Sequence, residues 1–363
     1  MKVSKGYCFD DVLLVPKHSE VVSRDKVDLS VELPRGLIGI RYPFVTANMK
    51  TVTGVKMANA IQEYGGLAIL HRFYDVPSML IDDFRRTEWK DDSPPAGYVG
   101  ASVGIKNSDF EIVERLVSYG CRIICVDVAH GDHGLVSEFI NRIRYKHQNI
   151  VIIGGNVCTE AGANLLWEAG ADIIKVGIGG GSLCSTRIET GNGYPQLSAL
   201  DIVCNGTYKS RDPETTTPPP HRYVGHMSYA ADGGFTDPLF IADGGIRYAG
   251  DCAKALCFAD MVMIGNLFAG TDESPGEIII QNSRKLKQYA GSSTYKPNHV
   301  EGVTALVPYK GPVKDVINHL KDGITSNCSY QGVSNLHDLK INPEFVEISN
   351  AGLVESHPHD VVL

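Results

Sequence analysis

The sequence predicts an α/β protein folded as one (β/α)₈ barrel, and three observations lead to this fold class. Short apolar runs recur along the chain, and each is followed by a polar or glycine-rich turn and then by a helical pattern. Most of these runs start 21 to 32 residues apart, which suits one strand plus one helix. With 363 residues, 43% of them hydrophobic, the chain can fill one large barrel core.

Eight apolar runs supply the expected strands. Several are β-branched and apolar on both faces, as strands buried in a parallel sheet should be. In chain order they are Pro43–Ala47, Gly66–Leu70, Tyr98–Ala101, Ile123–Val126, Ile150–Ile153, Asp172–Val176, Leu239–Ala242 and Asp260–Ile264.

Helical patterns lie between these runs and complete the β-then-α rhythm. An open, doubly wound sheet is the alternative, but it requires a G-x-G-x-x-G motif after the first strand, and none is present. The predicted helices cover Gly54–Tyr64, Ser108–Tyr119, Leu135–His147, Thr159–Ala169 and Ala249–Phe258.

Two segments interrupt the rhythm of this single predicted domain, which spans residues 1–363. Asn205–Pro238 is rich in proline and lacks a helical period, so we interpret it as a polar excursion from the barrel. Gln281–Leu363 is expected to hold a polar loop, a helix near Val313–Lys321 and a short tail.

Composition narrows the classes of function. The net charge of −8 argues against a general surface for nucleic acid, although it leaves room for a small anionic substrate. The nine cysteines are odd in number and show no C-x-x-C spacing, which favours a reducing cytoplasm over a disulfide framework. Neither a signal peptide nor an apolar stretch of 18 residues is visible, so no membrane association is expected.

Polar residues and glycines gather at the carboxyl end of nearly every predicted strand. In a barrel these ends form one rim, where reactive groups collect. The residues are Asn48-Met49, His71-Arg72, Ser102-Val103, Asp127, Gly155-Asn156, the loop Gly177–Arg187, Asp243-Gly244-Gly245 and Gly265-Asn266.

The loop Gly177–Arg187 carries the strongest chemical signal, because glycines and small polar residues surround one thiol, Cys184. Such a loop can aim backbone carbonyls at a monovalent cation or N–H groups at a phosphate. Cys184 could attack an electrophilic carbon as a thiolate. The alternative is a tight turn that holds an unreactive cysteine.

The two last strands end in loops that could bind phosphate, Asp243–Gly245 and Gly265-Asn266, or that are ordinary turns. The Asp243 carboxylate would suit a ribose, which favours a nucleotide. Glu301 could act as an acid or base, or lie solvated on the surface. His130-x-x-His133 offers only two ligands, which is a weak signal for a metal.

These segments together resemble the family of IMP dehydrogenase and GMP reductase over nearly the whole chain. The cysteine loop with the downstream Gly-x-Gly-x-x-Gln is the most specific part of the match. The other matching segments are Phe9–Leu14, Ala47–Met49, Thr190–Leu197, Ile241–Ile246 and Pro308–Gly311.

The resemblance implies a site in which the cysteine, here Cys184, bonds to C2 of a purine nucleotide as a thioimidate. It implies a homotetramer, NADPH and a potassium ion held by Gly179, Gly181 and Cys184. Residues that match the substrate site are Asn156, Ser182, Asp243, Gly245, Gly265, Asn266, Gly291, Glu301 and Gly302. Residues that match the cofactor site are Asn48, Arg72, Asp127, Ala129 and Gly179.

Three features favour the reductase branch, in which GMP and NADPH give IMP and ammonia. Only Phe73–Gly97 lies where the dehydrogenase usually inserts its CBS regulatory modules. The segment Tyr289–Glu301 lacks the arginine of the dehydrogenase flap, and residues 65–73 and 300–302 look like the Gram-positive reductase. Thr186 and Glu301 match the pair that handles the leaving amine.

Other features keep the alternatives open: an IMP dehydrogenase without CBS modules, a related reaction on a modified purine nucleotide, or a nucleotide-binding protein without turnover. Gly180 stands where the family usually has proline, and Asn266 replaces a usual serine or glycine. The tail Glu355–Asp360 looks like the dehydrogenase, and Arg222-Tyr223 in the excursion could imitate its flap.

Overall fold

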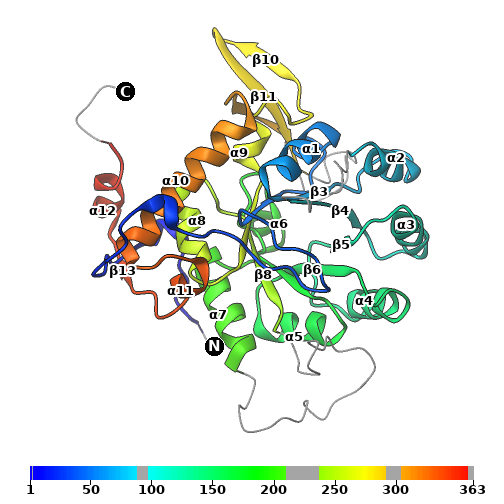
Figure 1. The fold of residues 1–363 in the computed structure, drawn as a ribbon, viewed down its shortest axis with the longest axis horizontal. Coiled ribbons are helices and arrows are strands. Elements are labelled where there is room, and N and C mark those ends of the chain that lie inside the picture. The colour runs from blue at the N-terminus through cyan, green and yellow to red at the C-terminus, as the bar shows by residue number, and fades with distance from the viewer. Residues whose placement is uncertain (2, 88–96, 210–236, 292–303, 359–363) are drawn as a thin grey trace.

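The computed structural model describes residues 1, 3–87, 97–209, 237–291 and 304–358 of the chain. Eight parallel strands close into a barrel, and helices surround it (Figure 1), which confirms the predicted fold class. The barrel strands are β2 (Phe44–Thr46), β3 (Leu67–Leu70), β4 (Tyr98–Val103), β5 (Ile123–Asp127), β6 (Val151–Val157), β7 (Ile173–Val176), β8 (Leu239–Asp243) and β9 (Met261–Ile264).

All eight barrel strands lie within one to four residues of the ranges predicted from the sequence. Their side chains are buried on both faces, because the barrel interior packs against one side and the helices against the other. β2 pairs with β9 in register from Phe44 opposite Val262 to Thr46 opposite Ile264, and this pairing closes the barrel.

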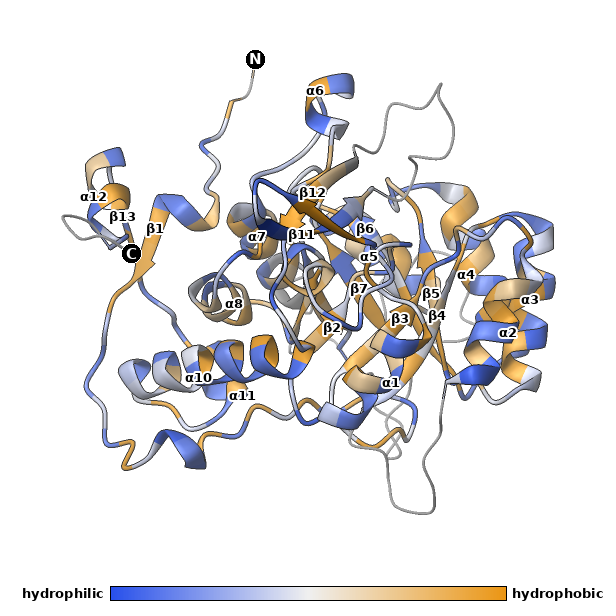
Figure 2. Cartoon of the chain, turned by 90° about the horizontal axis from the view of Figure 1, so that it is seen from above, coloured by the Kyte–Doolittle hydropathy of each residue, from blue (hydrophilic) through white to orange (hydrophobic). Residues whose placement is uncertain are grey.

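The helices turn apolar faces toward the strands and polar faces outward (Figure 2). The helices that follow the barrel strands are α1 (Val55–Tyr64), α2 (Ser78–Arg86), α3 (Asn107–Ser118), α4 (Gly134–Lys146), α5 (Glu160–Glu168), α6 (Thr186–Thr190), α7 (Gln196–Lys209), α8 (Ala249–Leu256) and α9 (Asn266–Ala269). Short 3₁₀ helices cover Phe9–Asp11 and Arg24–Lys26. None of the helices in these described ranges has the length and apolar character needed to cross a bilayer.

The predicted excursion begins later than expected, because residues 205–209 form the last turn of α7. Gly206 there looks like a loop residue, but a Cβ atom at this position would lie 2.7 Å from Glu160 Oε2 on α5. The glycine therefore permits close helix packing. Residues 210–236, which hold Arg222-Tyr223, lie outside the described residues.

The C-terminal part contains strands where the sequence predicted a polar loop. β10 (Ile278–Gln281), β11 (Arg284–Ala290) and β12 (Thr304–Pro308) form an antiparallel sheet that projects from the barrel (Figure 1). Asn282 and Ser283 make the β10–β11 turn, both with positive φ. Such a turn usually contains glycine, and its absence hid the hairpin.

A long helix, α10 (Val313–Gln331), extends ten residues beyond its predicted end at Lys321. Its buried residues Val313, Ile317, Leu320, Ile324 and Cys328 continue one apolar stripe past that point. Gly323 resembles a terminator but marks a contact, because a Cβ atom there would lie 2.2 Å from Ala249 Cβ on α8.

The two ends of the described chain are joined beside the barrel. β1 (Val12–Leu14) pairs antiparallel with β13 (Phe345–Glu347), away from the barrel sheet (Figure 2). Two further short helices, α11 (Leu336–Leu339) and α12 (Asn350–Glu355), complete the C-terminal part.

The amino end of the barrel is held by a buried ion cluster. Arg144 is 0% exposed and donates hydrogen bonds to the carbonyl oxygens of Gly170 and Ile150. It also pairs with Asp172, whose other carboxylate oxygen lies 2.7 Å from Arg35 Nε. The cluster lies away from the carboxyl ends of the strands, so its role in this fold class is structural.

Candidate active site

A single pocket at the carboxyl ends of the barrel strands collects the residues that the sequence placed on this rim. Every predicted site residue within the described ranges lines it: Asn48, Arg72, Asp127, Ala129, Asn156, Gly179, Gly181, Ser182, Cys184, Thr186, Asp243, Gly245, Gly265, Asn266 and Gly291. Glu301 and Gly302 lie outside the described residues. The barrel geometry thus brings together side chains that are spread over more than two hundred positions of the sequence.

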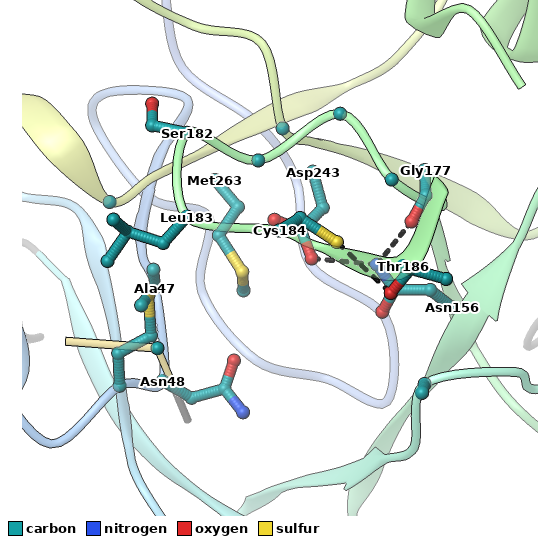
Figure 3. A pocket seen from close by; sticks show the side chains of 18 of the residues that line it. Ala47, Asn48, Asn156, Gly177, Ser182, Leu183, Cys184, Thr186, Asp243 and Met263 are labelled. Carbon is teal, nitrogen blue, oxygen red and sulfur yellow. Dashed lines mark hydrogen bonds between the residues drawn. The ribbon is translucent and has the colours of Figure 1, made fainter. Parts of the chain in front are cut away.

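Cys184 is exposed on the loop between β7 and α6, and its side chain faces the pocket (Figure 3). Its Sγ donates a hydrogen bond to Thr186 Oγ1 at 3.2 Å. Its backbone N–H donates to the carbonyl oxygen of Gly181 at 3.0 Å, which turns the loop back on itself. A thiol in this position is open to an incoming electrophile and has a hydroxyl group beside it.

Glycines shape this loop by allowing close approaches. Gly179 has φ +82°, and a Cβ atom there would lie 2.5 Å from Arg187 Cγ, so the arginine stem packs directly on the backbone. Gly244 after β8 has φ +114°, and a Cβ atom there would lie 3.1 Å from the backbone N of Gly181. The loops after β7 and β8 therefore touch each other through their backbones.

A lysine lies at the centre of the pocket floor. Lys175 on β7 is 2% exposed, and its Nζ lies 3.0 Å from Asp127 Oδ1 and 3.0 Å from Asp243 Oδ2. Burial opposes the charge of the ammonium group, but Asp243 and Asp127 outweigh it and raise the pKa of Lys175 above its ordinary value. The lysine is therefore charged at neutral pH.

Asp127 at the end of β5 is surrounded by donors. Burial would raise the pKa of its carboxyl, but Lys175 and Arg72 more than offset this and hold the pKa below the ordinary value of 3.8. Asn48 adds a side-chain hydrogen bond. Arg72 Nε lies 3.8 Å from Asp127 Oδ2, and this nitrogen is buried without a hydrogen-bond partner in the described part of the chain.

Asn156 connects the end of β6 with its neighbours. Its amide Nδ2 donates to the carbonyl oxygen of Gly177 at 2.7 Å and to Asp243 Oδ2 at 2.8 Å (Figure 3). The carboxylate of Asp243 is thus oriented by two donors, Lys175 and Asn156. Because it is 23% exposed toward the pocket, it can still accept a hydrogen bond from a ligand hydroxyl.

The side of the pocket formed by β8 and β9 presents the predicted phosphate-binding residues. Gly245 follows β8, while Gly265 and Asn266 follow β9, where α9 begins. Tyr289 on β11 also lines this side, and a Cβ atom at position 265 would lie 2.7 Å from its Oη. Its hydroxyl is close to Met49 Sδ, at 3.7 Å.

The described residues offer little for a divalent metal and more for a monovalent cation. In the described ranges, no group of three or more His, Cys, Asp or Glu gathers to hold a metal ion. His133 Nδ1 accepts a hydrogen bond from the N–H of Leu135 and caps α4. Beside the cysteine loop, however, Gln196 Oε1 is buried without a hydrogen-bond partner, 3.2 Å from where a Gly180 Cβ would lie. Oxygen donors of this kind fit a monovalent cation.

Several pocket residues escaped the sequence analysis. Lys175 is a charged residue inside the otherwise apolar strand Ile173–Val176, which could have marked it as functional. The sequence does not show, however, that its side chain points into the pocket. Tyr289 gave none, because its strand was not expected. Ala47, Met49 and Met263 also line the pocket, and their apolar character suits contact with a flat ring.

A barrel with an exposed cysteine, a charged floor and glycine-rich loops at its mouth is typical of an enzyme, and the comparisons with known proteins show its family. The family model for the IMP dehydrogenase / GMP reductase domain matches residues 6–359. The chain belongs to this family. It is accordingly an NAD(P)-dependent oxidoreductase that acts on a purine nucleotide.

Individual relatives point to one branch of the family. The chain is 36% identical to an inosine-5'-monophosphate dehydrogenase of Borreliella burgdorferi, over 99% of this chain and 98% of that protein. It is 39% identical to the enzyme of the same name from Chlorobaculum parvum, over 73% of this chain and 53% of that protein. A third, from Nitrosopumilus maritimus, is 29% identical over the full length of both.

These names favour the dehydrogenase over the reductase that the sequence analysis placed first. Of the three features behind the reductase prediction, the segment between Tyr289 and Glu301 lies mostly outside the described residues. The connection between β3 and β4 holds the helix α2, which was not among the predicted helices, and it is too short for the CBS modules, as the sequence predicted. The Nitrosopumilus alignment has 502 positions against 363 residues here, so that relative carries additional sequence.

Proposed function

We propose that this protein oxidises IMP with NAD⁺, using Cys184 as the nucleophile. The observation that carries the proposal is the exposed Cys184 thiol on the pocket loop, with the Thr186 hydroxyl at 3.2 Å and the Asp243 carboxylate lining the same pocket. The names of the three relatives support this direction of the reaction.

The chemistry follows from these groups. The thiolate of Cys184 adds to C2 of the purine, and the hydrogen on C2 then leaves as a hydride with the electron pair of the C–H bond. What remains is the thioimidate, in which C2 is singly bonded to sulfur and doubly bonded to a ring nitrogen. Water then adds to C2, the sulfur leaves as the thiolate, and the base carries the new oxygen. The dinucleotide, when bound, supplies the acceptor for the hydride.

The pocket residues divide into two groups in this proposal. Asp243 binds the ribose of the mononucleotide, and its phosphate is held by Ser182, Gly245, Gly265 and Asn266. The side formed by Asn48, Arg72, Asp127, Ala129 and Gly179 receives the dinucleotide. Gly179, Gly181 and Cys184 would hold K⁺ through their carbonyl oxygens and so stabilise the conformation of the cysteine loop.

A second candidate is the reduction of GMP to IMP and ammonia, which passes through the same thioimidate. The hydrogen bond between Cys184 and Thr186 favours it, because a hydroxyl beside the sulfur could relay a proton to the departing amine. The absence of arginine from residues 289–301 points the same way, since the dehydrogenase flap uses one.

Absorbance at 340 nm separates the two reactions. We expect a rise when purified protein receives IMP and NAD⁺ in a potassium buffer; a fall with GMP and NADPH would instead select the reductase. Cys184→Ala should abolish turnover but leave mononucleotide binding within a few-fold of wild type. The matched control is Cys158→Ala, which removes a half-buried cysteine outside the pocket lining. Unchanged turnover in Cys184→Ala would refute both candidates.

A further inference from the structure

Lys175 is a buried group that the cysteine chemistry does not use. Its ammonium lies 3.0 Å from each of two carboxylates, Asp127 at the end of β5 and Asp243 at the end of β8. The proposed function places these carboxylates on the two sides of the pocket that receive different ligands. One charged group thus spans the floor between the dinucleotide side and the mononucleotide side.

We propose that Lys175 is a positioning residue that couples the two halves of the pocket, by orienting Asp127 toward the dinucleotide and Asp243 toward the mononucleotide with one ammonium group. This inference rests on the proposed function, because it takes both ligands to bind side by side. Lys175 itself touches neither reacting atom. It acts through the two carboxylates.

The hydrogen bonds hold both carboxylates in place and leave Asp243 with an oxygen to offer. Lys175 and Asn156 both donate to Asp243 Oδ2, and among the described residues no donor reaches Oδ1. Lys175 donates to Asp127 Oδ1, and Asn48 adds a further side-chain hydrogen bond to this carboxylate, while Arg72 Nε remains 3.8 Å from Oδ2, beyond hydrogen-bonding distance. The Asp243 carboxylate, which is held at one oxygen, suits a hydroxyl group of a ribose.

The neighbouring strand leaves room for the lysine. A Cβ atom at Gly155 on β6 would lie 2.4 Å from Lys175 Cβ and 2.8 Å from its carbonyl oxygen. Any side chain at position 155 would therefore displace Lys175. The packing of β6 against β7 sets the lysine at the midpoint between the two carboxylates.

Removing the ammonium changes the electrostatics of both carboxylates. The charged and titratable groups around the two carboxylates are Lys175, Arg72, the buried Cys125 and, on β11, Tyr289, whose pKa is raised by burial and by Asp243. Without Lys175, the Asp127 carboxylate loses the cation that holds its pKa low and faces Asp243 over a buried floor, so its protonated form becomes easier to reach. The acid limb of dinucleotide binding should therefore move to higher pH.

The test uses the full-length protein and measures binding of IMP and of NAD⁺ separately by calorimetry. Lys175→Met should weaken both affinities by about tenfold or more and shift the acid limb of NAD⁺ binding to higher pH. Lys175→Arg should restore much of both, because it keeps the charge. Lys340→Met is the matched control, since Lys340 pairs with Asp260 at the other end of the barrel and should leave both affinities unchanged.

A second measurement does not depend on the folding of Lys175→Met. Asp243→Asn should weaken the affinity for NAD⁺ several-fold when NAD⁺ is measured without IMP. Asp243 lies on the mononucleotide side, but its loss lets Lys175 move fully onto Asp127. Asp127→Asn should in turn weaken the affinity for IMP when IMP is measured without NAD⁺. Cross-effects of this kind are what a coupling through one lysine requires.

The outcomes separate the two proposals. If wild-type protein binds neither IMP nor GMP, the proposed function fails. If wild-type protein binds its ligands but Lys175→Met changes both affinities less than about twofold, or changes only one, the coupling role is wrong while the proposed function stands. Absence of both cross-effects in the aspartate variants would also overturn the coupling.

Discussion

At the scale of single residues, charge pairing sets the pH range in which the pocket floor is intact. The pKa of Asp127 is lowered from 3.8, so its contribution to stability is present above that value and is lost as the pH falls through the lowered pKa. The pKa of Lys175 is raised above 10.5, so its contribution is present below that value and is lost at higher pH. The floor is therefore intact throughout the neutral range.

His71 should make the folding stability of the protein fall in mild acid. It is 5% exposed, and burial, aided by Lys50, lowers its pKa from 6.5 to about 4. The unfolded chain takes up a proton first as the pH falls from 6.5 toward 4, so stability declines by about 3 kcal/mol over this window.

The variant His71→Asn tests this prediction, because asparagine can still accept the hydrogen bond from the N–H of Phe73. Urea unfolding at pH 7 and pH 4.5 should show a smaller loss of stability in the variant than in wild type. Equal losses in the two proteins would assign the acid sensitivity to other groups.

At the scale of elements, the strands were predictable and several of their partners were not. Apolar runs such as Ile173–Val176 identify a buried parallel strand, and the parallel barrel then places every carboxyl end on one rim. The convergence of Asp127, Cys184 and Asp243 could therefore be predicted. The β10–β11 hairpin could not, because its turn, Asn282-Ser283, lacks glycine, and the length of α10 was obscured by Gly323.

The contact between β6 and β7 should tolerate no side chain at position 155. Gly155→Ala would place its Cβ 2.4 Å from Lys175 Cβ, which should cost about 1–3 kcal/mol of stability and reduce turnover as Lys175 moves. Gly134→Ala is the control, because nothing lies within 4 Å of its Cβ position at the start of α4. Chemical denaturation and turnover assays measure the difference between the two variants. Equal stability and turnover in Gly155→Ala and Gly134→Ala would show that the β6–β7 contact can relax, and the prediction would be wrong.

The cysteine loop should respond to the identity of the monovalent cation. If the carbonyl oxygens of Gly179, Gly181 and Cys184 hold K⁺, replacing it with Li⁺ should lower turnover several-fold, since the smaller ion cannot contact all three. The rate at which iodoacetamide alkylates Cys184 should change with the cation as well. Turnover and alkylation that are the same in both salts would exclude a cation at this loop.

At the scale of the whole molecule, the two ends of the barrel serve different purposes. The carboxyl end carries the pocket, and the amino end carries the cluster of Arg35, Arg144 and Asp172. The sequence could suggest the first, because its residues are polar among glycines. The sequence could not suggest the charge cluster at the amino end, because Asp172 and Arg144 come together only after β7 and α4 pack.

Asp172→Asn should reduce stability without changing ligand affinity. The substitution leaves Arg144, which is 0% exposed, without its charge partner, and such losses typically cost about 3–5 kcal/mol. Asp201→Asn on the exposed face of α7 is the control and should be neutral. Melting temperatures and Michaelis constants should be measured together. A changed Michaelis constant with an unchanged melting temperature in Asp172→Asn would contradict the prediction.

The pairing of β2 with β9, which closes the barrel, also determines when the protein can finish folding during translation. β2 pairs with β9, whose first residue, Met261, is translated about 200 residues after Thr46. At about 5–20 residues per second, the nascent sheet keeps an open edge for on the order of ten seconds or more. A transcript truncated before Met261 would therefore release a polypeptide with an unpaired parallel strand, a template for aggregation that the complete chain conceals.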